Sequence, residues 1–482
     1  MTPRVMSSRD QPGFSASKSR LAALLVVPAS EANSRAWRIS WLAYWLLISF
    51  ASSLLAYQLN WIPHDSGSIY DISSGFSPYL RSLLEHGQFV DTETVAGARR
   101  TTMRLPAVPV FHALLSQVLG RGVLAHVLAK NLIAYGLSAC AMQRFAREHQ
   151  LRALAPFALF ALVFLNPVGL RTLPLLGGEE SYYIPLLVVL LVVLSSPPST
   201  WHRPTLHGVG IVLAILCLTK STLSLLAVVL LVFVARYTPN KRSALIPAAY
   251  VLVALGGWSV WSYQTTQHVT HVFNISSYDG INLYKGNNEY VQALYPDVHL
   301  DVLDVVGITT PPRALRADEW AVNDHFRRRA TDYLLLHPWR TVQFLGFKAA
   351  APFLLANSPA RIYAGADTVR TELPAIIEQS KVATVKARVI ASALWLYKLS
   401  FLASLVWAAR NTWRRRYTQA SVLYLALTAT LAVPFVIGFA YVNHLCALYT
   451  LMFVYAWGAF FSSSSARVSG RVMTRDGQLM RV

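Results

Sequence analysis

The sequence predicts an all-α, polytopic membrane protein, and its composition is the first of two reasons. Hydrophobic residues make up 54% of the 482 residues, charged residues make up 14%, and the mean hydropathy is +0.40. Soluble domains carry about 25% charged residues. The second reason is that several apolar runs approach the roughly 20 residues that a helix needs to cross a bilayer. We therefore expect about ten transmembrane helices, with further helices along the outer face.

Ten apolar runs are the predicted spans. They cover residues 39–59, 122–144, 153–169, 181–195, 205–219, 222–236, 243–263, 387–409, 417–440 and 444–463. Basic residues concentrate in the connections 144–152, 236–242 and 410–416. Because Lys and Arg are retained on the cytoplasmic side, this pattern predicts cytoplasmic tails at 1–38 and 464–482. The richness in Ala, Leu and Arg favours a bacterial inner membrane, with the outer side facing the periplasm.

Acidic residues collect on the predicted outer side. Of the 23 Asp and Glu residues, five lie in 60–121, two in 170–180 and twelve in 264–386. Within the transmembrane domain 39–463, the segment 60–121 is the candidate catalytic loop. The large outer loop 264–386 is too long to lack structure of its own. Two shorter apolar stretches, 106–120 and 341–357, are predicted to lie at the outer interface rather than to cross.

Charge and cysteine usage disfavour two other classes of protein. The net charge of +20 suggests a nucleic-acid binder, but the basic residues fall in the short loops and tails that orient membrane helices. Cys140, Cys217 and Cys446 all lie inside apolar runs and have no metal-type spacing. We therefore expect no nucleic-acid partner, no disulfide framework, no metal and no cofactor.

The first outer segment contains an ordered set of motifs. Asp65 in "HDSGSIYDIS" is followed by "YLRSLLEHGQF" and then by "RLPAVPVFHALL". This order resembles the first outer loop of the GT-C-fold glycosyltransferases, in particular the protein O-mannosyltransferases and the lipid A aminoarabinose transferases. The stretches "GINLYKGNNEYV" at 280–291 and "YLLLHPWRTVQFLGFK" at 333–348 are similar to later parts of such enzymes. The sequence differs from many relatives in having one carboxylate, Asp65, in place of two adjacent ones, and "YVNHLCALY" in place of a late Arg-Tyr pair.

The resemblance implies a GT-C-like fold and an inverting transfer of a sugar from a polyprenyl-phosphate donor to a glycan, lipid or protein acceptor on the outer face. An acceptor hydroxyl needs a base to take its proton, and a departing phosphate needs fixed cations. The candidate catalytic carboxylates are Asp65, as general base, and Asp71, Glu179 and Glu180. The candidate substrate-binding residues are His64, Arg104, Lys130, Arg171, Lys220, Asn287, Asn288, Lys348 and His444.

Other interpretations stay open. Asp65 is also a suitable N-cap for a helix that begins near Ser68, and Glu179 and Glu180 are also typical of an exposed turn. A flippase or transporter of polyprenyl lipids would also place a cation such as Lys130 inside a span, but the sequence lacks the expected repeat symmetry and paired broken helices. A non-catalytic assembly protein would leave the motif order that begins at Asp65 unexplained.

Overall fold

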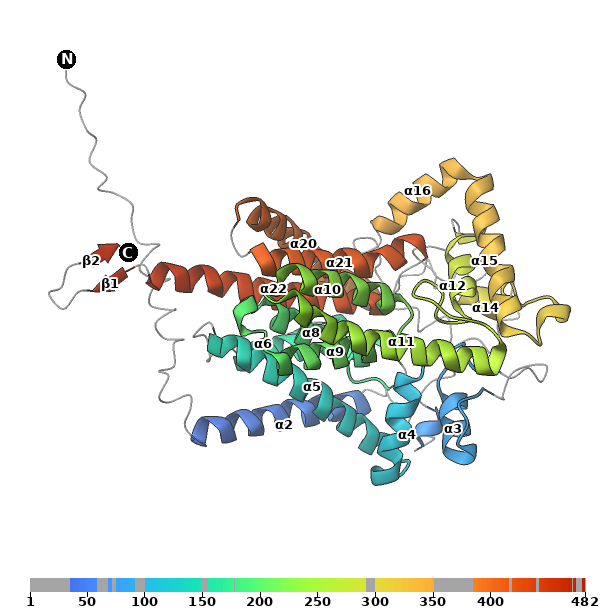
Figure 1. The fold of residues 1–482 in the computed structure, drawn as a ribbon, viewed down its shortest axis with the longest axis horizontal. Coiled ribbons are helices and arrows are strands. Elements are labelled where there is room, and N and C mark those ends of the chain that lie inside the picture. The colour runs from blue at the N-terminus through green and yellow to red at the C-terminus, as the bar shows by residue number, and fades with distance from the viewer. Residues whose placement is uncertain are drawn as a thin grey trace, which may run out of the picture.

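The computed structural model describes residues 35–58, 68–71, 75–91, 100–148, 155–165, 167–176, 178–291, 300–350, 385–415, 418–438, 442–469, 471–473 and 479–481. In this part of the chain the long helices form one bundle. Shorter helices gather at one end of the bundle, and the C-terminal strands lie at the other (Figure 1).

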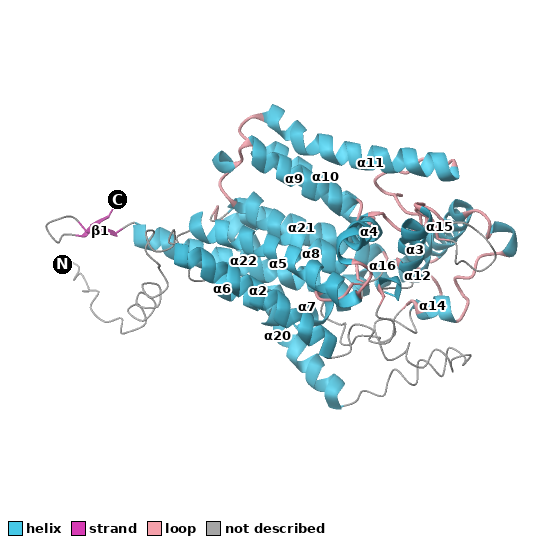
Figure 2. Cartoon of the chain, turned by 90° about the horizontal axis from the view of Figure 1, so that it is seen from below, coloured by secondary structure: helices cyan, strands magenta, loops and turns pink. Residues whose placement is uncertain are grey.

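The bundle is built from long apolar helices. They are α2 (Arg35–Gln58), α5 (Val123–Glu148), α8 (Glu180–Ser195), α9 (Arg203–Cys217), α10 (Thr222–Tyr237), α11 (Leu245–Thr266), α20 (Val385–Trp413), α21 (Thr418–Ile437) and α22 (Val442–Ser469). The short turns η5 (Pro198–Thr200) and η6 (Lys241–Ala244) connect neighbouring helices. Helices α9, α10 and α11 lie on one side of the group formed by α5, α8, α21 and α22, whereas α20 lies on the other (Figure 2).

The degree of burial follows from the apolar character of each helix. Most residues of α8 are apolar and buried, and α8 contacts α5, α9, α21 and α22. Helix α11 is just as apolar around its circumference, yet it leaves Leu252, Val253 and Val260 more than half exposed. A helix that is apolar on all sides belongs inside protein or lipid. The exposed apolar face of α11 is therefore suited to contact with lipid.

The short helices come from the two predicted outer loops. The first loop supplies η2 (Ile69–Asp71), α3 (Ser77–His86) and α4 (Ala107–Leu119). The second supplies α12 (Asp279–Gly286), α14 (Val302–Val305), η7 (Arg313–Leu315), α15 (Glu319–Leu336) and α16 (Pro338–Ala349), which we call the cap. The cap lies directly on the bundle at Gly286, where an added Cβ would lie 2.2 Å from the carbonyl oxygen of Gly438.

Helices form at all ten predicted spans, and four of them are confirmed as long and apolar enough to cross a membrane. These four are Ile39–Gln58, Val123–Phe145, Lys241–Thr266 and Gln419–Ile437. The number of crossings, ten, stays a prediction. The two stretches that we expected not to cross contain α4 and α16, which have 13 and 12 residues.

One prediction needs correction. The third predicted span is not one helix, because α6 (Ala155–Phe160) passes through the π-type turn η4 (Ala161–Leu165) before α7 begins at Pro167 and runs to Thr172. Proline lacks the N–H that a continuous helix would need at this point. The described residues are otherwise helical, with one short hairpin near the C-terminus, where β1 (Arg471–Met473) pairs antiparallel with β2 (Leu479–Arg481). The Asp-Gly pair at 476–477 is a typical hairpin signal that the sequence interpretation did not use.

Candidate active site

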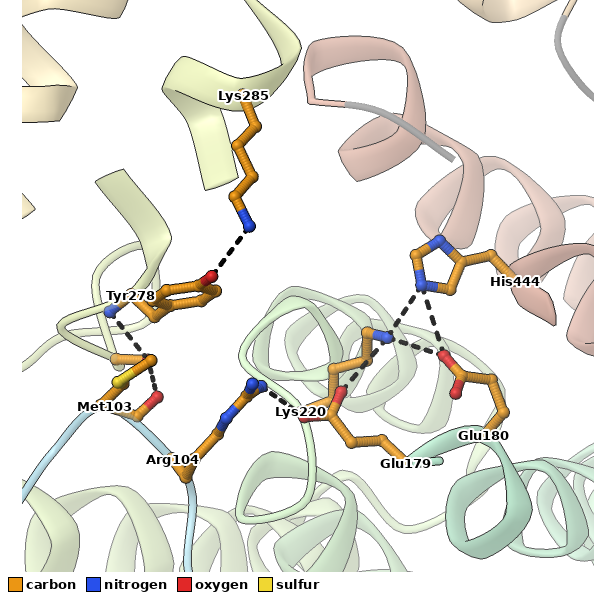
Figure 3. A network of polar contacts seen from close by, with 9 residues as sticks. Met103, Arg104, Glu179, Glu180, Lys220, Tyr278, Lys285 and His444 are labelled. Carbon is orange, nitrogen blue, oxygen red and sulfur yellow. Dashed lines mark hydrogen bonds and ion pairs between the residues drawn. The ribbon is translucent and has the colours of Figure 1, made fainter. Parts of the chain in front are cut away.

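A cluster of five polar side chains lies where the bundle meets the cap, and we call it the ion-pair cluster (Figure 3). Its members are Arg104, Glu179, Glu180, Lys220 and His444. The Nζ atom of Lys220 lies 2.9 Å from Glu180 Oε1 and 3.2 Å from Glu179 Oε2. His444 Nε2 lies 3.3 Å from Lys220 Nζ and 3.4 Å from Glu180 Oε1. Four distant segments of the chain thus meet in one network of charged side chains.

Helix ends place these charges. Glu179 and Glu180 stand at the N-terminus of α8, where the helix dipole favours negative charge. Lys220 lies in the turn that joins the end of α9 to the start of α10. His444 is in the first turn of α22, and its ring stacks on Phe435 with the ring centroids 4.9 Å apart.

Lys220 is a permanent cation in this site. Its side chain is 15% exposed. Burial alone would lower the pKa of Lys220, but the carboxylates of Glu180 and Glu179 raise it above its usual value. The lysine therefore stays charged at neutral pH. Burial alone would raise the pKa of Glu180, but Lys220 and His444 lower it below its usual value, so Glu180 stays charged too.

Arg104 is the more loosely held cation. Its closest ion-pair distance, from Nη1 to Glu179 Oε1, is 3.7 Å, and its buried Nε donates no hydrogen bond to the described residues. The guanidinium lies over the rings of Phe76 and Tyr278, with its carbon 5.4 and 5.2 Å from their centroids. A Cβ at Gly75 would lie 2.6 Å from Arg104 Nη2, so a larger residue there would displace the guanidinium. The Nε donor of Arg104 is therefore not used by any described residue.

Glu319 fixes the backbone that carries Arg104. Its carboxylate accepts hydrogen bonds from the N–H groups of Thr101 and Thr102, at 3.1 Å each, and from the hydroxyl of Ser277 at 2.8 Å. This contact joins the first outer loop to the first turn of α15. The cap thus sets the position of a site residue that belongs to another loop.

Tyr278 connects the ion-pair cluster to a second group of charges in the cap. Its hydroxyl accepts a hydrogen bond of 2.8 Å from Lys285, which is fully buried. Lys285 also pairs with Asp301 at 2.7 Å and with Asp304. Burial would lower the pKa of Lys285, but Tyr278 and these carboxylates raise it above its usual value. Tyr278 thus lies between a fixed ammonium and the Arg104 guanidinium.

A second group of predicted site residues lies apart from the ion-pair cluster. It consists of Asn287, Asn288 and Lys348. Lys348 Nζ donates to Asn287 Oδ1 at 2.9 Å and to the carbonyl of Ile437 at 3.3 Å. Asn287 also donates to Ile437 O, and Asn288 donates to the carbonyls of Tyr284 and Lys285. This arrangement favours a structural joint between α12, α16 and the end of α21.

Lys130 also has structural partners. Its Nζ donates to the carbonyl of Leu173 and, at 2.9 Å, to that of Leu175, just after α7 ends. Its ammonium lies 5.6 Å from the ring centroid of Tyr182, whose hydroxyl is hydrogen-bonded to His112 at 2.5 Å. An intramembrane cation that satisfies helix-terminal carbonyls needs no substrate to explain it.

Several predicted site residues are not tested by the geometry. His64 and Asp65 lie outside the described residues. Asp71 falls in η2 and Arg171 in α7, but their side chains are outside the described part of the structure.

Asp279 is a carboxylate near the site that the sequence interpretation missed. It begins α12, its Oδ2 accepts from Ser276 N at 3.2 Å, and its carboxylate is hydrogen-bonded to Ser221, next to Lys220. Burial raises the pKa of Asp279 to about 6. Its position directly before the "GINLYKGNN" stretch was the only signal in the sequence.

The pH dependence of stability tests the joint at Lys348. Burial lowers the pKa of Lys348 to about 7, whereas a lysine of the unfolded chain has a pKa of about 10.4. Between these values the unfolded chain binds more protons, so the contribution of Lys348 makes stability rise with pH. We expect the difference in unfolding temperature between wild type and Lys348→Met to increase in favour of wild type from about pH 7 to pH 10. Thermal unfolding in detergent measures it.

The matched control for this prediction is Lys241→Met. Lys241 is exposed and lies at the opposite end of α10 from Lys220. This variant should keep the wild-type slope of unfolding temperature against pH. A slope in Lys348→Met that equals the wild-type slope would contradict the burial-shifted titration.

Comparison with known proteins identifies a solved structure of similar fold. No family model matches the sequence, and no curated protein matches it. The crystal structure of an Archaeoglobus fulgidus oligosaccharyltransferase in the apo form is similar, with a TM-score of 0.50 and 12% identity over 90% of this chain and 52% of that one. The same protein with zinc and sulfate gives a TM-score of 0.46 at 12% identity, over 88% and 51% of the two chains. The chain thus spans about half the length of the solved structure that it matches.

This similarity defines the class of fold. The oligosaccharyltransferase is a GT-C-type glycosyltransferase, so the GT-C-like fold predicted from the sequence is confirmed at the level of the fold. At 12% identity the similarity concerns the fold alone.

Proposed function

We propose that this chain is a membrane glycosyltransferase that moves a sugar from a polyprenyl-phosphate donor to an acceptor at the outer face of the membrane, with inversion. The observation that carries the proposal is the ion-pair cluster, which places Lys220 and the loosely held Arg104 at the cap end of an apolar GT-C-type bundle. The solved structure of similar fold is named an oligosaccharyltransferase, which agrees with transfer of a sugar.

The two cations suit the leaving group of this reaction. When the anomeric bond breaks, negative charge develops on the lipid phosphate. Arg104 offers a planar fork of donors that matches phosphate oxygens, and Lys220 adds a fixed point charge behind it. In a site with little water such preorganised charges stabilise the transition state strongly. In this proposal Glu179 and Glu180 hold Lys220 in place, and His444 supports Glu180.

Asp65 is the proposed general base, with Asp71 as the second candidate carboxylate. The support comes from the segment to which both belong, because Gly75 and Phe76 of the same loop pack against Arg104. A carboxylate delivered by this loop would act on the acceptor hydroxyl while Arg104 holds the phosphate. His64 and Arg171 would add polar contacts to the donor.

The proposed topology puts this chemistry at the periplasmic face of a bacterial inner membrane. The cap and the ion-pair cluster are at one end of the bundle, whereas α22 and the C-terminal strands point to the other end (Figure 1). With ten crossings both tails, 1–38 and 464–482, are cytoplasmic. The exposed apolar side chains of α11 support its assignment as a span that faces lipid.

The experiment that tests the function is turnover of a panel of labelled polyprenyl-phosphate sugars by the purified protein, with membrane extract as the source of acceptors. We expect one donor to be consumed, with the sugar transferred in the inverted anomeric configuration. If no donor reacts but a labelled polyprenyl lipid changes leaflet in vesicles that contain the protein, the flippase interpretation replaces the transferase. If the protein shows neither transfer nor lipid translocation, a non-catalytic assembly role is the explanation.

A further inference from the structure

A cavity of about 540 Å³ shares two elements, the first outer loop and the start of α15, with the surroundings of Arg104, but it shares no residue with the ion-pair cluster. The first outer loop contributes Gln88, Phe89 and Thr101 to its walls, the end of α11 contributes Trp261 and Thr265, and the start of α15 contributes Asp318. Its volume falls within the range of about 300–1,000 Å³ that is typical of small-molecule sites. Three parts of the chain that are distant in sequence thus build a hollow of ligand size.

The polar groups of the cavity are suited to an uncharged ligand that is rich in hydroxyls. Asp318 uses Oδ1 to cap α15, through the N–H groups of Trp320 and Ala321, and its Oδ2 accepts no hydrogen bond from the described residues. The side-chain amide of Gln88 is likewise unpaired within the described residues, and Gln88 is exposed. Asp318 and the neighbouring Glu319 make the rim acidic, which disfavours phosphates and other anions.

One wall of the cavity is aromatic. Trp261 is half-buried, and its ring nitrogen donates no hydrogen bond to the described residues. Phe89 lies behind it, packed against Tyr79 and Trp258 with centroids 4.8 and 6.2 Å apart. A sugar ring presents an apolar C–H face together with hydroxyl edges. An aromatic wall with a few well-placed acceptors and donors is complementary to both.

The backbone around the cavity argues against an extended peptide. An extended peptide that binds as an added β-strand needs unpaired backbone N–H and C=O groups on the protein. Here the N–H groups of Thr101 and Thr102 are taken by Glu319, and Asp91 and Arg100 pair through their own backbones at 2.8 and 3.1 Å. The contacts that remain available are side-chain contacts, which favours a compact ring over a strand.

We propose that this cavity binds a neutral carbohydrate and is the acceptor subsite of the enzyme. Thr101 is three residues before Arg104, so their Cα atoms are at most about 10 Å apart. A glycan seated in the cavity can therefore extend toward the ion-pair cluster. The acceptor role rests on the proposed transfer reaction, whereas the binding of carbohydrate does not.

Saturation-transfer NMR of the purified protein with maltose, cellobiose, lactose and mannobiose tests the binding without a donor. We expect saturation transfer to at least one disaccharide in wild type and its loss in Thr265→Trp, which fills the cavity. The matched control is Thr331→Trp, an equal change at an exposed position of α15. If no disaccharide gives a signal, if a serine-containing peptide gives one instead, or if the signal survives in Thr265→Trp, the proposal is wrong.

A second measurement separates this proposal from the proposed function. In the transfer assay Thr265→Trp should raise the acceptor KM or abolish transfer, whereas the control Thr331→Trp should keep the wild-type acceptor KM. An unchanged acceptor KM would overturn the acceptor role. If the wild type binds disaccharide but consumes no donor, the transferase proposal fails and the carbohydrate site stands.

Discussion

Lys220→Met is expected to lower sugar transfer by about two to three orders of magnitude, which is the usual effect of removing one preorganised charge from a transition state. Lys220 is the one group among the described residues that contacts Glu179, Glu180 and His444 together. Its loss would remove the fixed cation near the departing phosphate and would let Arg104 close onto Glu179. Turnover of the donor identified from the panel measures the effect.

The same substitution should also destabilise the protein, and this must be separated from the chemistry. Removing one partner of a buried pair costs about 3–5 kcal/mol, because it leaves an uncompensated charge. The double variant Lys220→Met with Glu180→Gln removes one of those charges and should regain much of the unfolding temperature while transfer stays low. Lys220→Arg keeps the charge and should retain more activity than Lys220→Met.

Lys241→Met again provides the matched control, since it removes an exposed lysine from the other end of α10. Its transfer rate should equal that of wild type, and any fall in its unfolding temperature should reflect only the lost contacts of Lys241 Nζ with the carbonyls of Ala235, Arg236 and Thr238. A folded Lys220→Met protein that transfers sugar at the wild-type rate would show that the ion-pair cluster only holds helices together.

The helices could be predicted closely from the sequence, because apolar runs with charged or proline ends carry that information locally. The run predicted at 181–195 became α8 (Glu180–Ser195), and the run at 222–236 became α10 (Thr222–Tyr237). Glu179, Glu180, Lys220 and His444 could also be chosen as candidates from the sequence, since charges at the ends of apolar runs are conspicuous; their roles stay predictions. What the sequence could not provide was their mutual contact, because Lys220 and His444 are 224 positions apart and helix packing sets that distance.

Asn287 and Lys348, predicted to bind substrate, show what a local sequence pattern leaves out. A Gly-Asn-Asn stretch and a lysine at a helix end suggest ligand contacts when each is considered alone. In the structure both side chains donate to the carbonyl of Ile437 at the end of α21, near the contact of Gly286 with Gly438. Their substrate-binding role stays a prediction. No local pattern reveals that two backbones touch. Glu319 and Tyr278 were missed for the same reason, since their importance depends on contacts across loops.

Asp65→Asn is expected to reduce transfer by about two to four orders of magnitude, the range associated with loss of a general base. Asparagine is nearly isosteric with aspartate but cannot accept the acceptor's proton at neutral pH. It is also about as good an N-cap as aspartate. The substitution therefore separates the two interpretations of Asp65, because a capping residue would tolerate it and a base would not.

The measurement compares transfer, donor binding and unfolding temperature for Asp65→Asn, Asp71→Asn and the control Asp332→Asn, which alters an exposed carboxylate of α15. Asp65→Asn should bind donor and unfold like wild type while transfer is nearly lost, and Asp332→Asn should resemble wild type in all three. If Asp65→Asn transfers normally and Asp71→Asn does not, the base is Asp71. If both transfer normally, the base must be a carboxylate outside this loop, and Asp279 becomes the first to test because burial raises its pKa to about 6, close to the value that a base working at neutral pH needs.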